Sequence, residues 1–187
     1  RPSAGACGGG VMTAPILLRA GDPGLAAHAA VFGSRPSPSL DGLLGELEAA
    51  GLDGRGGAGF PVHRKLAAVA RASARGGAPI VVGNGSEGEP LSAKDRVLLQ
   101  RAPHLVLDGL LICAEALGSD EAHLVVHADA RSVAERALAE RSDAGIVRLH
   151  VADHGFVGGE ASALVAGVSG RPGVPSDRIV RLAERGL

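Results

Sequence analysis

Tryptophan and tyrosine are absent from this chain of 187 residues, which has only three phenylalanines. Lysine is also scarce, since arginine outnumbers it 17 to 2, and there is a single asparagine. This skew is typical of a GC-rich coding bias. The exceptions are therefore informative. Lys65, Lys94 and Asn84 all fall in two segments whose patterns point to ligand binding.

Cysteine is rare, and neither sign of charge is in excess. Cys7 and Cys113 are too few and too far apart for a zinc ribbon or an iron–sulfur cluster built from this chain alone, so we expect no metal site. The net charge of -1 argues against a nucleic-acid partner. No apolar run of about 20 residues is present, so we expect no direct membrane insertion and a cytoplasmic location.

The length is that of one compact domain with short extensions. Residues 1–38 are rich in glycine, proline and alanine, and we expect a flexible N-terminal arm and lead-in there. The arm has no apolar core that would mark a signal peptide. We expect the domain itself over 39–175, and a C-terminal tail over 176–187.

The order of helical and strand patterns predicts an α/β fold with a mostly parallel sheet flanked by helices. Short β-branched runs bounded by turn residues predict the strands, and apolar spacing at three to four residues predicts the helices. The expected strands cover 78–83, 122–128 and 146–152. The expected helices cover 40–50, 61–75, 93–101, 104–117 and 132–141, with a further short helix starting near Glu160.

A glycine-rich loop at 54–61 (Gly-Arg-Gly-Gly-Ala-Gly-Phe-Pro) is the first segment that could carry chemistry. Without side chains, its backbone can lie against a flat or phosphorylated ligand, and the following helix offers free N–H groups to a phosphate. A dinucleotide fingerprint needs a strand before the loop, whereas the preceding segment is helical. The alternative is a flexible surface turn.

A polar block at 84–96 is the second such segment, and it follows a predicted buried strand, where α/β folds place ligands. It contains Asn84, Glu87, Glu89 and then Lys94-Asp95-Arg96. Groups of both signs can bind a polar ligand through hydrogen bonds. The alternative is a solvated turn followed by a helix capped by Ser92.

A third candidate is the glycine pair before Glu160 at a predicted helix start. A carboxylate there is favourable for the helix dipole without any further role, and the spacing leaves both interpretations open. The histidines do not cluster in the sequence, and no hydrolase triad or metal motif is present.

Together these segments resemble the 51 kDa flavoprotein subunit of respiratory NADH dehydrogenase, complex I. The match covers about 50–175, and more distantly the 84–90 block resembles the C subunit of Rnf electron-transport complexes. The residues that carry the match are the 54–61 octapeptide, Lys65, Asn84-x-x-Glu87-x-Glu89-Pro90, Lys94-Asp95-Arg96, Ala102-Pro103-His104 and Gly158-Gly159-Glu160-x-x-x-Leu164.

The resemblance implies a domain that binds FMN and accepts hydride from NADH, with electrons passing to an iron–sulfur or quinone-reducing partner. It implies that the glycine loop lies against flavin and nicotinamide, that Phe60 stacks on adenine, and that Glu87 and Glu89 are the catalytic carboxylates. The residues implied to bind cofactor are Gly54, Arg55, Gly56, Gly57, Gly59, Phe60, Lys65, Asn84, Ser86, Gly159 and Glu160.

The chain also departs from the family pattern. The family usually has aspartate at the position of Ser86 and tyrosine at that of Phe156. In the family, a segment that completes the FMN pocket, a ubiquitin-like domain and a helical domain with a [4Fe–4S] site follow this region. The resemblance therefore implies a C-terminally truncated relative, with the cluster only in the missing region and other electron-transfer subunits as partners. Any attachment to the cytoplasmic face of a membrane is expected to be made through those partners.

Three functions remain open on the sequence. The first is an NADH-oxidising flavoprotein domain. The second is a remnant of that domain without catalysis, or a fragment of an Rnf-type subunit. The third is an unrelated α/β nucleotide-binding module, which the absence of a P-loop and of a strand before the glycine loop disfavours.

Overall fold

The sheet has three parallel strands in a computed structural model that describes residues 16–54, 59–86 and 92–152. The strands β1 (Val81–Gly85), β2 (Ala122–His127) and β3 (Val147–Ala152) follow one another in that order. Val81 lies opposite Ala122, which lies opposite Val147. The α/β class and the parallel sheet predicted from the sequence are confirmed.

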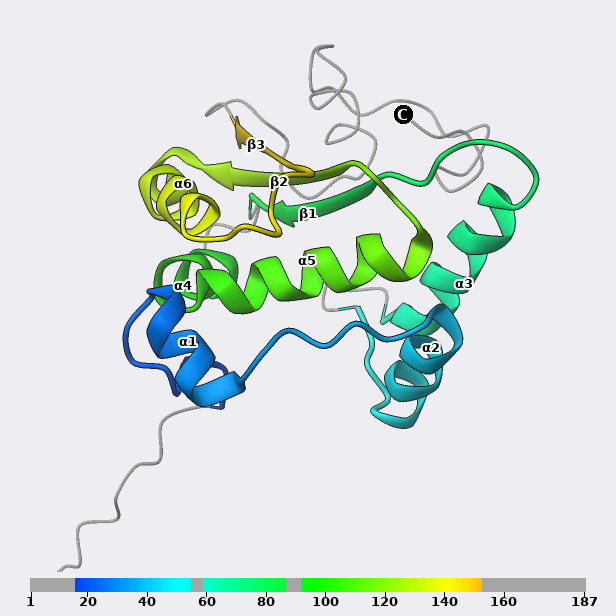
Figure 1. Ribbon diagram of the computed structural model, residues 1–187, viewed down its shortest axis with the longest axis horizontal. Coiled ribbons are helices and arrows are strands. Elements are labelled where there is room, and N and C mark those ends of the chain that lie inside the picture. Colours follow the sequence, from blue (N-terminus) through cyan, green and yellow to red (C-terminus); the bar gives the residue numbers. More distant parts are fainter. Residues whose placement is uncertain (1–15, 55–58, 87–91, 153–187) are drawn as a thin grey trace, which may run out of the picture.

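The helices that connect the strands all pack on one face of the sheet (Figure 1). Helices α4 (Lys94–Arg101) and α5 (Pro103–Leu117) lead from β1 to β2, and α6 (Arg131–Ala139) follows β2 after a short 3-10 turn, η2 (Ala128–Ala130). When successive parallel strands are added to a sheet in one direction through right-handed crossovers, every connecting helix lies on the same side of that sheet. The core between them contains Leu99, Leu107, Leu110, Ala114, Leu124, Val126 and Ala134.

The remaining helices surround α5 (Figure 1). A 3-10 turn, η1 (Ile16–Leu18), precedes α1 (Leu25–Phe32), which contacts α5 near one end, while α2 (Leu40–Ala49) and α3 (Val62–Ser73) pack together near its other end. Helix α5 therefore positions both the sheet and the segment that carries the glycine loop.

Local sequence signals place several helix boundaries correctly. Ser39 caps α2, because its Oγ accepts a hydrogen bond from the Gly42 backbone N–H at 3.2 Å. The break expected at Pro103 is confirmed: Ala102 separates α4 from α5, and Pro103 is the first residue of α5. Gly118, in the left-handed conformation (φ 67°), ends α5.

The first strand differs from its prediction. We expected it over 78–83, but it covers Val81–Gly85, because pairing with β2 runs from Val81 opposite Ala122 to Gly85 opposite Val126. The β-branched pattern that marked the strand says nothing about register, which the neighbouring strand decides. As a result Asn84 lies within the strand and not in the loop after it.

Helix α1 was not expected, since the lead-in at 16–38 showed only glycine, proline and short apolar pieces. Its sequence, Leu-Ala-Ala-His-Ala-Ala-Val-Phe, is apolar almost all round and lacks the spacing of an amphipathic helix. Packing against α5 stabilises it, and Gly33 (φ 76°) ends it. The helix expected near Glu160 lies outside the described residues.

Within the described ranges, no single helix is long and apolar enough to cross a membrane. The bent pair of α4 and α5, which meet at 100°, reaches that length and composition only when the two are taken together.

Candidate functional site

The glycine loop is closed at its base by backbone hydrogen bonds. The Gly54 N–H donates to the Phe60 carbonyl at 2.9 Å, and the Val62 N–H donates to the Leu52 carbonyl at 3.0 Å. An antiparallel bridge joins Asp53 and Pro61. The two ends of the loop are thus held together directly before α3, and the segment before the loop is helical, as expected.

Of the two described glycines at the ends of this loop, only Gly59 has a conformation that requires glycine, whereas a side chain at Gly54 would meet ordinary van der Waals contact. Gly59 has a left-handed conformation (φ 55°), which residues with a side chain rarely adopt. A Cβ at Gly54 would lie 3.4 Å from the Phe60 carbonyl oxygen, within the closed base of the loop. Phe60 itself is half exposed (51%), so its ring is open to a ligand. Arg55, Gly56 and Gly57 lie outside the described residues.

Lys65 lies on the first turn of α3, shortly after the loop. Its backbone N–H donates to the Pro61 carbonyl at 3.3 Å, and its side chain is exposed. In the described part of the chain, its ammonium group makes no ion pair. A helix N-terminus and a lysine on the same turn present two sources of positive charge, which together suit a phosphate.

Asn84 and Ser86 meet at the carboxyl end of β1. The Asn84 Oδ1 accepts hydrogen bonds from the Ser86 backbone N–H at 3.0 Å and from the Ser86 Oγ at 2.8 Å. Asn84 is exposed, whereas Ser86 is only 1% exposed. The carboxyl ends of parallel strands are where α/β folds bind ligands, so Asn84 is well placed to bind one.

Gly85, between these two residues, is required by packing. A Cβ there would lie 2.7 Å from Leu99 Cδ1 and 3.0 Å from the Val125 carbonyl oxygen. This close approach seats α4 directly against β1. Gly85 therefore fixes the backbone that carries Asn84 and Ser86.

The described site residues lie at two places in the fold. Gly54, Gly59, Phe60 and Lys65 lie at the loop and the start of α3, while Asn84 and Ser86 lie at the end of β1. Helix α3 and strand β1 both pack on α5, but the Asn84 side chain points to the face of the sheet opposite α5. That both places line one pocket stays a prediction, as do the roles of Glu87, Glu89, Gly159 and Glu160, which lie outside the described residues.

A cluster of hydrogen-bonded ionisable side chains around α5 was missed by sequence reasoning. His28 Nε2 lies 2.8 Å from Asp108 Oδ2, and Asp108 Oδ1 lies 2.8 Å from Arg141 NH1. Arg141 also forms an ion pair with Asp143 at 2.8 Å, and Asp143 contacts Arg35 at 3.1 Å. His28 and Asp108 are 80 positions apart, and Arg35 and Asp143 are 108 apart. No local sequence pattern could therefore predict these contacts. The cluster fastens the N-terminal lead-in to the domain.

His104, part of the Ala-Pro-His motif, extends this cluster. Its Nε2 lies 3.1 Å from Glu140 Oε2, which also accepts a hydrogen bond from the Leu25 N–H at 2.8 Å. Burial lowers the pKa of His104, although the nearby Glu140 carboxylate acts to raise it. His104 is therefore a structural link between α5, α6 and α1.

His123 and His150 form a pair on the sheet face opposite the helices. His123 Nδ1 lies 2.8 Å from His150 Nε2, and His123 is 3% exposed. Burial lowers the pKa of both side chains, and the adjacent His150 lowers that of His123 further. Among the described residues, no group of three or more histidine, cysteine or carboxylate side chains is arranged to hold a metal ion.

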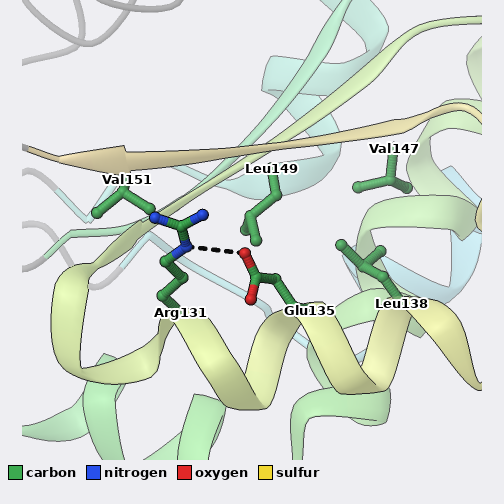
Figure 2. A pocket seen from close by; sticks show the side chains of 6 residues that line it. All are labelled: Arg131, Glu135, Leu138, Val147, Leu149 and Val151. Carbon is green, nitrogen blue, oxygen red and sulfur yellow. Dashed lines mark hydrogen bonds and ion pairs between the residues drawn. The ribbon is translucent and has the colours of Figure 1, made fainter.

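A shallow hollow of about 380 Å³ lies between α6 and β3 (Figure 2). Leu138 projects from α6 towards Val147 and Leu149, and the ion pair between Arg131 and Glu135 lies beside them at 2.7 Å. None of the described residues implied to bind cofactor lines this hollow, so we do not assign it to the site.

Comparison with known proteins gives a consistent result. The chain matches the Nuo51 FMN-binding domain over residues 47–187. It is 31% identical over 152 residues to NADH dehydrogenase [ubiquinone] flavoprotein 1 of Dictyostelium discoideum, covering 72% of this chain and 32% of that protein. It is 29% identical over 153 residues to the NADH-ubiquinone oxidoreductase 51 kDa subunit of Neurospora crassa, covering 72% of this chain and 31% of that one. The chain thus spans about a third of the length of these relatives.

Solved structures of related proteins also match this chain. An NAD⁺-reducing [NiFe]-hydrogenase in its air-oxidised state superposes with a TM-score of 0.63 and 31% identity, covering 89% of this chain and 30% of that one. Its H₂-reduced state gives a TM-score of 0.60 and 33% identity, covering 75% of this chain and 26% of that one. The fold, the glycine loop, the Asn84 segment and these matches together show that the chain belongs to the Nuo51 FMN-binding domain family.

Proposed function

We propose that this domain binds FMN between the glycine loop and the carboxyl end of β1. The observation that carries the proposal is Asn84. Its Oδ1 is occupied by both donors of Ser86, so its exposed amide can offer only N–H donors. The carbonyl oxygens of a flavin ring and the oxygens of its phosphate are acceptors, and they match such a group.

The other described groups fit the same ligand. Lys65 adds a point charge on the first turn of α3, and the N-terminus of that helix adds free N–H groups for a phosphate. Gly54 and Gly59 keep the ends of the loop free of side chains, which allows a planar ring to approach the backbone. The set of donors therefore suits a phosphorylated aromatic cofactor.

We propose that the bound flavin is reduced by NADH. The chemistry of accepting a hydride belongs to FMN when it is bound, and the protein holds the two rings in contact and excludes water. The half-exposed ring of Phe60 would cover part of the second nucleotide. Glu87, Glu89 and Glu160 are proposed as carboxylates around the two rings, as the family resemblance implies.

We propose that the electrons then leave this domain for an iron–sulfur or quinone-reducing partner outside these 187 residues. The chain has two cysteines, fewer than the four thiolates that usually hold a [4Fe–4S] cluster. A relative described as an NAD⁺-reducing hydrogenase and a relative named as the 51 kDa subunit of an NADH-ubiquinone oxidoreductase support an electron-transfer role in a multi-subunit assembly. An alternative is a domain that keeps the fold without binding flavin, and the same experiment distinguishes the two.

The test is an FMN titration of the purified chain, followed by the quenching of flavin fluorescence. We expect saturable binding that weakens in Asn84→Ala and is unchanged in Gln100→Ala, which removes another exposed amide at the far end of α4. NADH oxidation would then be measured with ferricyanide and with a soluble quinone, and only ferricyanide should be reduced. A chain that leaves FMN fluorescence unchanged supports the non-flavin alternative.

A further inference from the structure

The orientation of the Asn84 amide is fixed by chemistry. The Ser86 backbone N–H can only donate a hydrogen bond, so the Asn84 atom 3.0 Å away must be the carbonyl oxygen Oδ1. The Ser86 hydroxyl lies 2.8 Å from the same oxygen and donates a second hydrogen bond. The nitrogen of the Asn84 amide is therefore turned away from Ser86.

The strand decides where this nitrogen points. Side chains alternate between the two faces of a strand, and a Cβ at Gly83 or Gly85 would contact Leu110 or Leu99 on the helix side. Asn84 therefore lies on the opposite face, away from α4 and α5. It is exposed there, whereas Ser86 is 1% exposed. One residue of the pair is open to a ligand, and the other is enclosed by protein.

We propose that Ser86 is a positioning residue, whose hydroxyl locks the Asn84 amide as a hydrogen-bond donor toward the cofactor. Ser86 acts through Asn84 and does not touch the cofactor, because its hydroxyl is buried and already donated. The site is then specific for acceptor atoms at this position. This inference rests on the proposed function, since the ligand that Asn84 meets is taken to be FMN.

The effect of Ser86 on the Asn84 amide has its physical basis in conformational entropy. A free asparagine side chain rotates about its terminal bond, and each of its two orientations presents a different group to a ligand. Two hydrogen bonds to one oxygen hold a single orientation before binding, so less freedom is lost when the ligand arrives. Removing the hydroxyl leaves only the backbone N–H to hold it.

A double-mutant cycle on FMN affinity tests this role. Ser86→Ala should weaken FMN binding by about fivefold to tenfold, in line with the loss of one hydrogen bond. In an Asn84→Ala background the same change should alter affinity by less than about twofold, because Ser86 then has nothing to position. A residue that only supports the fold would cost the same in both backgrounds.

A volume-matched variant separates hydrogen bonding from packing. Ser86→Cys keeps a side chain of similar shape, but a thiol is a weak donor. Its FMN affinity should follow that of Ser86→Ala. An affinity equal to that of the parent chain would show that packing alone matters and would overturn the positioning role.

A third variant leaves the buried serine intact, so it does not depend on the tolerance of that position. Asn84→Asp keeps an oxygen for Ser86 and places a second acceptor where the donor was. It should bind FMN at least about tenfold more weakly than Asn84→Ala, because an acceptor facing an acceptor is left unpaired. Equal binding by these two variants would overturn the inferred orientation.

The outcomes distinguish the two proposals. If the parent chain binds no FMN, the proposed function fails, and this inference fails with it. If the parent chain binds FMN and the cost of Ser86→Ala is absent, or persists undiminished without Asn84, the proposed function stands and the positioning role alone is wrong.

Discussion

His28 Nε2 lies 2.8 Å from Asp108 Oδ2, and the two side chains are 6% and 11% exposed. This buried contact joins helix α1, from the lead-in, to the central helix α5. Asp108 also forms an ion pair with Arg141, whose side chain is 5% exposed. One carboxylate thus holds two partners from opposite ends of the described chain.

Removing Asp108 should destabilise the domain strongly. Asp108→Ala leaves the Arg141 guanidinium with less compensation in a buried place, and we expect a loss of about 3 kcal/mol in the free energy of unfolding. Urea unfolding followed by far-UV circular dichroism measures it. As the control, Arg131→Gln breaks the exposed pair with Glu135 and should leave stability unchanged. Equal stability in the Asp108 variant and this control would show that the cluster contributes little.

The stability of the cluster should depend on acidity through Asp143. Hydrogen bonds from Arg141 hold the pKa of Asp143 at about 2, below its ordinary value of 3.8. Because the folded pKa is depressed, the contribution is fully present above the ordinary value and is lost as the pH falls toward 2. Asp143→Asn should therefore flatten the decline in stability between about pH 4 and pH 2.

Denaturant unfolding at several acidic pH values checks this. Glu46→Gln, at an exposed position on α2, serves as the control and should keep the slope of the parent chain. A slope that is the same in Asp143→Asn and in the parent chain would contradict the prediction.

A methyl group at Gly85 should not be accommodated. Gly85→Ala would bring Cβ to 2.7 Å from Leu99 Cδ1 and 3.0 Å from the Val125 carbonyl oxygen, and we expect a loss of about 1–3 kcal/mol from overpacking. Gly45→Ala, within α2 and with nothing within 4 Å, is the matched control and should stabilise by about 0.5–1 kcal/mol. Thermal melts of both variants measure the two effects. A Gly85→Ala variant as stable as the parent would mean that α4 can move away from β1.

The two lysines should differ in their effect on the cofactor. Lys65 lies on the first turn of α3 after the glycine loop. Lys94 lies at the start of α4, where its Nζ is 3.2 Å from Asp95 Oδ2. Lys65→Ala should weaken FMN binding by about tenfold, as expected for a lost hydrogen bond to a charged group, and Lys94→Ala should have a smaller effect. Flavin content after gel filtration measures both. Equal flavin retention by the two variants and the parent would refute the assignment of Lys65.

Local signals in the sequence determined most of the secondary structure. The Ser39 cap, the break at Pro103 and the β-branched runs specify their elements through nearby hydrogen bonds and fixed backbone angles, which act within a few residues. The family also followed from the sequence, since the glycine loop and the Asn84 block occur together at the right spacing. The α/β class could also be predicted, because it follows from the order of the helices and strands along the chain.

Tertiary structure alone decided the register of β1, the helix α1 and the buried contacts around Asp108. Register depends on the partner strand, so the placement of Asn84 inside β1 could not be read from its own segment. His28, Asp108 and Arg141 meet only after the chain has folded, because no short-range rule links residues so far apart. The orientation of the Asn84 amide belongs to the same class, since it depends on the buried hydroxyl of Ser86, and the burial of that hydroxyl is a property of the folded chain.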